Sequence, residues 1–187
     1  MNWNRVAEEY LAVADEVFGS LREHIDDLAK EIAERLNDGG KIMVCGNGGS
    51  AADAQHLAGE MVNKFLKDRK PYAAIALSTD TSVISAIGND FGYDLIFDKQ
   101  VRALGRSGDV LIAISTSGNA ANVCRAVETA GHMNILTVAL TGGTGGKLGK
   151  LVNIPVCISS SKSTPRIQEG HQLVIHGLCE RIEEILG

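Results

Sequence analysis

Short apolar runs alternate with helix-like stretches along most of this chain, and this alternation restricts its fold more than any other feature. The runs have the length and composition of buried strands and cover residues 42–45, 72–77, 109–114, 135–140 and 152–158. Helical patterns follow at 46–67, 83–87, 95–104, 120–130 and 165–186. Strands and helices in this order form a parallel sheet covered on both faces. We therefore expect an α/β fold, a three-layer αβα sandwich with a five-stranded, flavodoxin-like parallel sheet in which Pro155 marks an edge strand.

The first 38 residues form a segment of their own. Apolar side chains recur at steps of three or four from Tyr10 to Leu36, which predicts a long helical segment, kinked near Gly19 or divided there into a pair of helices. Gly39 and Gly40 end the pattern. The stripe is too long to be buried by one domain, so we expect it to pack on a second subunit as well. The prediction is one domain over 1–187, with an N-terminal helical oligomerisation segment at 1–38 and the α/β core at 39–187.

Composition and charge exclude several classes of protein. The chain has 187 residues, of which 44% are apolar and 22% charged, and a formal net charge of −5, as is typical of globular proteins. No apolar stretch approaches the ~18 residues that span a bilayer, and the N-terminus lacks a signal-peptide pattern. No basic stripe indicates a nucleic-acid surface, so we expect neither a membrane nor a nucleic acid as partner. The four cysteines form no Cys-x-x-Cys pair, which predicts reduced thiols in a cytoplasmic protein.

A glycine-rich turn follows the first apolar run. Gly46, Asn47, Gly48 and Gly49 separate the strand from the next helix, and Ser50 stands where it could cap that helix. Free backbone N–H groups at a helix N-terminus make such a turn an anion-binding site. No Lys-Ser or Lys-Thr pair follows the glycines, which excludes a Walker A loop, and no acidic residue stands where a dinucleotide-binding pattern requires one. A turn that is tight for packing alone is the other interpretation.

A second polar turn follows the third apolar run. Ser115, Thr116 and Ser117 place three hydroxyl groups at the start of another helix, followed by Gly118 and Asn119. Hydroxyl and amide donors without a lysine suit the phosphate monoester of a small molecule. Helix capping alone would require only one such residue. Because ligands of parallel sheets bind at the carboxyl ends of the strands, we expect both turns to belong to one phosphate-binding site.

Two helices carry polar residues of the kinds that bind metals or move protons. His56 and Glu60 are four residues apart and therefore project from one face of a helix. The last helix has an unusual concentration of polar side chains, namely Gln168, Glu169, His171, Gln172 and His176. Together the two helices could supply a mixed nitrogen and oxygen site for zinc. Glutamine is an uncommon zinc ligand, so structural hydrogen bonding by these residues is the alternative.

Five segments in combination resemble a known family. They read Cys-Gly-Asn-Gly-Gly-Ser at 45–50, Asp-Ala-Gln-His at 53–56, Gly-Asn-Asp-Phe-Gly at 88–92, Ser-Thr-Ser-Gly-Asn at 115–119 and Arg-Ile-Gln-Glu-Gly-His at 166–171. Over essentially its whole length the chain resembles the sugar isomerase (SIS) domain, and more narrowly the sedoheptulose-7-phosphate isomerases, also called phosphoheptose isomerases. The resemblance implies a cytoplasmic homotetramer that converts sedoheptulose 7-phosphate into D-glycero-D-manno-heptose 7-phosphate. That product feeds nucleotide-activated heptose synthesis, chiefly for lipopolysaccharide core.

The resemblance also implies roles for individual residues. Glu60 and His176 would be the acid–base pair. One zinc ion per subunit would be bound by His56, Glu60, Gln168 and His176. The residues that would contact the sugar phosphate are Asn47, Gly48, Gly49, Glu60, Asn89, Asp90, Ser115, Thr116, Ser117, Ala120 and Gln168, with Ser50 within reach.

One position departs from the family pattern. The phosphate loop usually continues Gly-Asn-Ser, whereas here Ala120 follows Asn119, so one hydroxyl donor to the substrate is missing. Isomerisation of another sugar phosphate is therefore an alternative. A second alternative is a non-catalytic regulator like DiaA, an SIS protein that binds a replication initiator. That branch lacks acid–base residues at the positions of Glu60 and His176, and this chain has both, which favours the enzyme.

Overall fold

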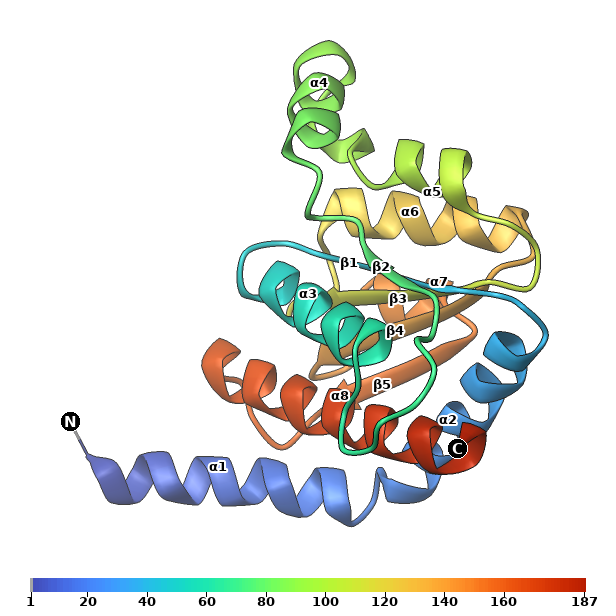
Figure 1. Cartoon of the computed structure of the whole chain (residues 1–187). Coiled ribbons are helices and arrows are strands. Elements are labelled where there is room, and N and C mark those ends of the chain that lie inside the picture. Colours follow the sequence, from blue (N-terminus) through green and yellow to red (C-terminus); the bar gives the residue numbers. More distant parts are fainter. Residues whose placement is uncertain (1) are drawn as a thin grey trace.

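The computed structural model describes residues 2–187 and contains the predicted five-stranded parallel sheet (Figure 1). The strands lie in the order β2-β1-β3-β4-β5, and each pairs in parallel with its neighbours. Their bounds are Ile42–Gly46 for β1, Ala74–Ala76 for β2, Val110–Ser115 for β3, Leu136–Gly142 for β4 and Ile154–Ile158 for β5. Pro155 lies in β5, an edge strand, as predicted. This strand order is that of the flavodoxin-like doubly wound folds.

Helices cover both faces of the sheet and make the fold the predicted three-layer sandwich. One face packs against α1 (Trp3–Phe18), α2 (Arg22–Asn37), α3 (Gly49–Val62) and α8 (Thr164–Leu186). The other face packs against α5 (Asp98–Leu104), α6 (Ala121–His132) and α7 (Leu148–Leu151). The helix α4 (Thr81–Phe91) and the 3-10 turn η1 (Tyr93–Leu95) connect β2 to α5.

The alternation of side chains along β1 shows how the two cores form. Ile42 and Val44 lie in the core beneath α2, α3 and α8, whereas Met43 and Cys45 lie in the core beneath α5 and α6. Successive side chains of a strand point to opposite faces, so a strand buried on both faces is apolar throughout. This is why the strand sequences read as continuous apolar runs.

The sheet register brings the two polar turns together. Gly46 at the end of β1 is paired with Ile114 near the end of β3. The chain leaves β1 toward β2 on one side and later returns to β3 on the other side. The carboxyl ends of β1 and β3 therefore form the switch point of the sheet, which is where open α/β folds bind their ligands.

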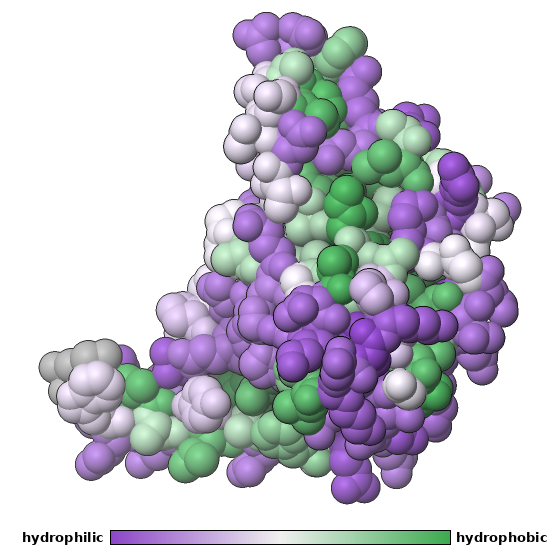
Figure 2. All heavy atoms as spheres, in the orientation of Figure 1, coloured by the Kyte–Doolittle hydropathy of each residue, from purple (hydrophilic) through white to green (hydrophobic). Residues whose placement is uncertain are grey.

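The N-terminal segment is a pair of helices, because the chain breaks at 19–21 between α1 and α2. Helix α2 buries Ile25, Leu28 and Ile32 in the core. Helix α1 buries only Val13 and Val17 among its residues, so most of the predicted stripe on α1 is exposed. Its exposed large apolar residues are Trp3, Tyr10, Leu11 and Phe18. Helix α1 projects from the body of the molecule, and apolar side chains are visible along it (Figures 1 and 2).

Some predicted boundaries were wrong. The helix predicted at 83–87 extends as α4 to Phe91, because Gly88 is accommodated inside the helix and the chain turns only at Gly92, where φ is 92°. The helix predicted at 95–104 begins at Asp98 after the 3-10 turn. Helix α3 ends at Val62 rather than at 67. The short helix α7 was not predicted.

Two further predictions concern the whole chain. Among residues 2–187, no helix combines the length and apolar character needed to cross a bilayer. All four cysteines are free, and Cys45, Cys124 and Cys179 are buried, which agrees with the predicted reduced thiols. Burial raises the pKa of the Cys45 thiol to about 12, so this side chain packs as a neutral apolar group.

Candidate active site

The turn between β1 and α3 is shaped by two glycines. Gly48 is the N-cap of α3 and has φ 55° and ψ −120°, a conformation that favours glycine. A side chain at Gly49 would collide with the amide of Gln168 on α8. Ser50 lies in the first turn of α3 and makes no capping hydrogen bond, so its predicted capping role was wrong. Its buried hydroxyl lies at the pocket described next.

The two polar turns line one pocket of about 190 Å³. Its polar lining comes from the β1–α3 turn and from the β3–α6 turn, and the lining residues are Asn47, Ser50, Ile114, Ser115, Thr116, Ser117 and Ala120. The pocket thus lies at the N-termini of α3 and α6 together, where free N–H groups and two helix dipoles favour an anion. The structure confirms that these predicted residues come together at the switch point.

Asn122 and Tyr93 belong to this pocket's support and were not predicted. Asn47 and Asn122 exchange two amide hydrogen bonds of 2.9 Å each. The Tyr93 hydroxyl donates a third bond of 3.1 Å to Asn47 Oδ1. These bonds fix the Asn47 side chain between β1, α6 and η1. The only sequence signal was a polar residue in the first turn of α6, which is too common to point to a site.

A second polar cluster lies where α3 runs beside α8. His56 Nε2 and His176 Nε2 are 2.8 Å apart, and the two ring planes are tilted by 52°. Glu60 Oε1 lies 3.7 Å from His56 Nε2. All three side chains are at least partly exposed to solvent. The predicted acid–base residues Glu60 and His176 therefore lie on facing helices, each close to His56, where a substrate could reach both.

Two glutamines of α8 connect this cluster to the pocket. Gln168 packs against Gly49, and Gln172 donates a hydrogen bond to Asp53 Oδ1. Asp53 is buried, and its Oδ2 has no hydrogen-bond partner among the described residues. Burial raises the pKa of the Asp53 carboxyl, against the opposing effect of the Gln172 and Gln168 amides and His56. The contacts of α3 with α8 thus run from the phosphate pocket to the histidine pair.

The donor set of this cluster suits zinc in its chemistry. Two imidazoles and the Glu60 carboxylate provide nitrogen and oxygen ligands. The amide of Gln168, the fourth predicted ligand, packs against Gly49 in this structure. Two nitrogen ligands of a tetrahedral zinc are about 3.3 Å apart, so the histidine pair would open by about 0.5 Å from its present separation. In the structure of residues 2–187, no group of three or more His, Cys, Asp or Glu side chains is already arranged around one point.

Three residues singled out in the sequence lie elsewhere. Asn89 and Asp90 are exposed on α4 and hydrogen-bond to each other at 2.8 Å, and within residues 2–187 neither bonds to a pocket residue. His171 is fully buried and contacts the Thr141 carbonyl oxygen at 3.1 Å through Nε2. Burial lowers the pKa of His171 to about 4, against the raising effect of that contact. His171 is therefore a neutral structural side chain of the core.

Comparison with known proteins agrees with this geometry. The SIS domain matches residues 7–142 of the chain. A phosphoheptose isomerase of Bordetella avium is 46% identical over 179 residues, which cover 94% of this chain and 90% of that protein. One from Neisseria gonorrhoeae is 54% identical over 158 residues, which cover 81% of this chain and 77% of that protein.

Solved structures give the same result. A phosphoheptose isomerase structure from Francisella tularensis has a TM-score of 0.92 and 40% identity, covering 97% of this chain and 96% of that one. A phosphoheptose isomerase structure from Neisseria gonorrhoeae has a TM-score of 0.89 and 45% identity, covering 97% and 98%. The pocket of hydroxyl groups, the facing Glu60 and His176 and these similarities lead to one assignment: the chain belongs to the SIS-domain family, in its phosphoheptose isomerase branch.

Proposed function

We propose that this protein is an aldose–ketose isomerase that converts sedoheptulose 7-phosphate into D-glycero-D-manno-heptose 7-phosphate. The observation that carries the proposal is the placement of Glu60 and His176 on facing helices, both close to His56. The phosphate pocket lies at the N-terminal end of the same α3 helix. A phosphorylated sugar chain bound there could extend along α3 to the acid–base residues.

The phosphate would be bound by neutral donors. Ser115, Thr116 and Ser117 offer hydroxyl groups, and the turn of Gly48 and Gly49 offers backbone N–H groups at a helix N-terminus. Many neutral donors distribute the phosphate charge without a buried lysine. The other end of the sugar, which carries the carbonyl group, would then lie near His56, Glu60 and His176.

The reaction moves one proton between carbons 1 and 2. Glu60 would take a proton from C1 of the ketose while the C2 oxygen gains a proton, which gives an enediol. His176 would supply and remove the protons at the two oxygens. Glu60 would then return a proton to C2 as the C1 hydroxyl loses its proton to become the aldehyde. The proton count balances, and no oxidant or reductant is required.

Zinc is proposed as the cofactor, with one ion per subunit. His56, Glu60, Gln168 and His176 would hold it. When bound, zinc would polarise the substrate oxygens and offset the negative charge that develops on them. Glu60 and His176 would also serve the proton transfer. Either the ion is therefore bound loosely enough for Glu60 to leave it, or it acts chiefly as a charge stabiliser.

We also propose the assembly and setting that the family implies. The exposed apolar side chains of α1 would be covered by another subunit of a homotetramer. The enzyme would act in the cytoplasm, and its product would enter nucleotide-activated heptose synthesis for lipopolysaccharide core. Neither a membrane nor a nucleic acid is proposed as a partner.

The substrate is tested by offering three ketose phosphates in parallel. Sedoheptulose 7-phosphate, fructose 6-phosphate and ribulose 5-phosphate are incubated with the protein, and aldose formation is followed by NMR. We expect product from the heptulose. Product from a shorter ketose alone would retain the reaction type and reject the seven-carbon substrate. Ala120 in the pocket makes that alternative slightly more plausible. Absence of turnover with every ketose would leave a DiaA-like regulator as the better description.

A further inference from the structure

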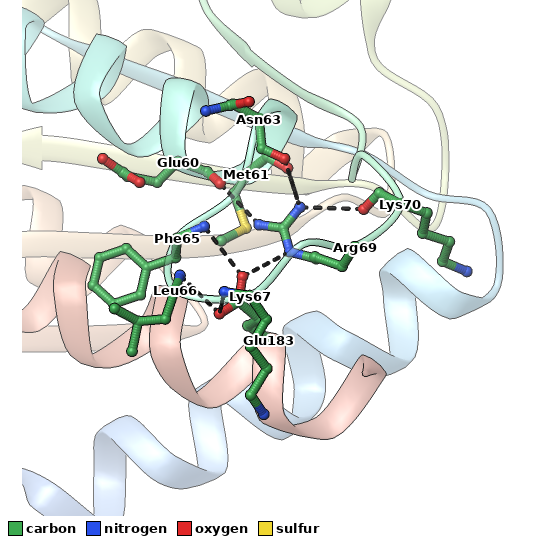
Figure 3. Close-up of polar contacts among 9 residues, drawn as sticks. All are labelled: Glu60, Met61, Asn63, Phe65, Leu66, Lys67, Arg69, Lys70 and Glu183. Carbon is green, nitrogen blue, oxygen red and sulfur yellow. Dashed lines mark hydrogen bonds and ion pairs between the residues drawn. The ribbon is translucent and has the colours of Figure 1, made fainter.

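A buried ion pair connects α8 to the segment that follows α3. Arg69 lies in the connection between α3 and β2, and its Nε is 3.1 Å from Glu183 Oε1 on α8 (Figure 3). The Arg69 and Glu183 side chains are 0% and 2% exposed. Moving two charged groups out of water costs several kcal/mol of solvation free energy. A buried ion pair is therefore stable only when further hydrogen bonds satisfy both side chains. The hydrogen bonds of Glu183 and Arg69 therefore indicate the role of the ion pair.

Glu183 holds the start of the connecting segment. Its two carboxylate oxygens accept hydrogen bonds from the backbone N–H groups of Phe65, Leu66 and Lys67, at 3.1, 2.9 and 2.9 Å. Burial acts to raise the pKa of Glu183, but these three donors and Arg69 outweigh it and keep that pKa below its usual value. The carboxylate thus remains charged in a buried place and fixes the chain directly after α3.

Arg69 holds the last turn of α3 itself. Its Nη2 donates to the Glu60 carbonyl oxygen at 2.8 Å, and its Nη1 donates to the Met61 carbonyl oxygen at 2.9 Å. The carbonyl groups in the last turn of a helix have no partner within the helix, and here a guanidinium group satisfies two of them. The Glu60 carboxylate points away from Arg69 (Figure 3), and its Oε1 lies near His56 Nε2 instead.

The same two helices carry the proposed acid–base residues. His176 and Glu183 are seven residues apart on α8, which is close to two helical turns and places them on nearly the same side. On α3, Glu60 is bonded through its backbone to Arg69, while its side chain lies beside His56. The chain of bonds from Glu183 through Arg69 to Glu60 therefore sets where the last turn of α3 stands relative to His176.

We propose that Arg69 and Glu183 are positioning residues of the active site, which hold Glu60 in register with His56 and His176 without touching the substrate. The inference rests on the proposed function, because that function makes Glu60 an acid–base residue of turnover. A planar guanidinium with several donors can reach two carbonyl groups and a carboxylate at once, and lysine cannot. Misplacement of a catalytic group by about 1 Å can lower the rate by ~100-fold.

The test compares E183Q and R69K with a matched control. The control is E184Q, which changes the neighbouring residue of α8, where Glu184 forms an exposed ion pair with Arg181 at 2.7 Å. Each variant is assayed well below its melting temperature. We expect E183Q and R69K to lower kcat by at least ~10-fold with KM changed by less than ~3-fold, because the phosphate pocket lies at the other end of α3. E184Q should stay within ~2-fold of the wild type in both.

Two further measurements separate positioning from a general loss of stability. If Arg69 and Glu183 act through Glu60, the double variant E60Q/E183Q should be no slower than E60Q alone. The NMR signals of the His56 and His176 rings should shift in E183Q and R69K, while those of His24 and His132 stay in place. Lower melting temperatures with unchanged kcat and unchanged ring signals would overturn the proposal. If the wild type turns over no sugar phosphate, the proposed function fails, and the ring signals alone still decide whether the pair positions α3.

Discussion

His56 Nε2 and His176 Nε2 lie 2.8 Å apart, so one ring must donate a hydrogen bond to the other. A contact this short between two ring nitrogens on different helices requires a single proton between them. The same two nitrogens, with Glu60 Oε1 at 3.7 Å from His56, form the centre of the candidate site. Zinc would replace that proton and separate the rings slightly.

The first prediction concerns the metal. The purified protein should contain about one zinc per chain, and chelation should lower turnover by at least ~100-fold, with recovery when zinc is returned. H56A should lose most of its zinc while retaining the fold by circular dichroism. Full activity in a rigorously metal-free sample would reject zinc as cofactor.

The second prediction concerns the pH dependence of stability. The pKa of His171 is about 4 in the folded protein because burial disfavours its charged form, against an ordinary value of 6.5. Between these two pH values the unfolded chain binds more protons than the folded protein. The contribution of His171 to the free energy of unfolding is therefore fully present above pH 6.5 and is lost as the pH falls toward 4. The slope from this one group approaches about 1.4 kcal/mol per pH unit. Denaturant unfolding at several pH values from 7 to 5 measures it.

A matched pair of variants identifies the group. H171Q removes the titration and should flatten the slope between pH 7 and 5, whereas H132Q, at the exposed end of α6, should leave it unchanged. Glu183 does not interfere with this measurement. Its pKa is lowered from the ordinary value of 4.5, so its contribution to the free energy of unfolding is lost only below about pH 4.5, outside the range from pH 7 to 5. An unchanged slope in H171Q would show that His171 is not the responsible group.

The third prediction concerns Ala120, which is the N-cap of α6 and makes no side-chain capping bond. A120S should stabilise the protein by about 1 kcal/mol, because a hydroxyl at this position can accept a bond from the first turn of the helix. The same hydroxyl faces the phosphate pocket and should lower KM. A121S, one residue further along, is the control and should do neither. Equal effects of both variants would contradict the capping explanation.

The fourth prediction concerns α1. Leu11 and Phe18 are 59% and 61% exposed, although each would gain about 1.5–3 kcal/mol from full burial. The double variant L11E/F18E should therefore raise the dissociation constant of the proposed assembly at least ~10-fold, as measured by sedimentation. E8Q, on the same helix, is the control. A wild type that sediments as a monomer at micromolar concentration would remove the shared-helix assembly.

The sequence was most informative where the signal is local. The apolar run of β1 and the glycine turn after it are adjacent in the chain, so periodicity and glycine content were enough to predict them. The rule that ligands of parallel sheets bind at the carboxyl ends of the strands was enough to group the turns after Cys45 and Ile114. That β1 and β3 are neighbours, with Gly46 paired with Ile114, came only from the structure. Gly88 misled the prediction of α4 because a glycine inside a helix costs only about 1 kcal/mol and other contacts can offset that cost.

Contacts between distant residues could not be predicted in the same way. Arg69 and Glu183 are separated by 114 positions, and Asn47 and Asn122 by 75. An arginine in a polar connection and a glutamate in a final helix are ordinary surface residues by composition, and only the packing of α8 against the end of α3 buries them. The roles of Asn89 and Asp90 came from the family resemblance, and whether they contact the substrate stays a prediction.

The most direct test of the whole account is turnover of sedoheptulose 7-phosphate in D₂O, followed by NMR. An enediol mechanism predicts heptose product with deuterium at C2, because the proton taken by Glu60 can exchange with solvent before it is returned. E60Q and H176A should each lower the rate by at least ~100-fold. The account is contradicted if the wild type gives no heptose, or if either variant turns over at a near-normal rate.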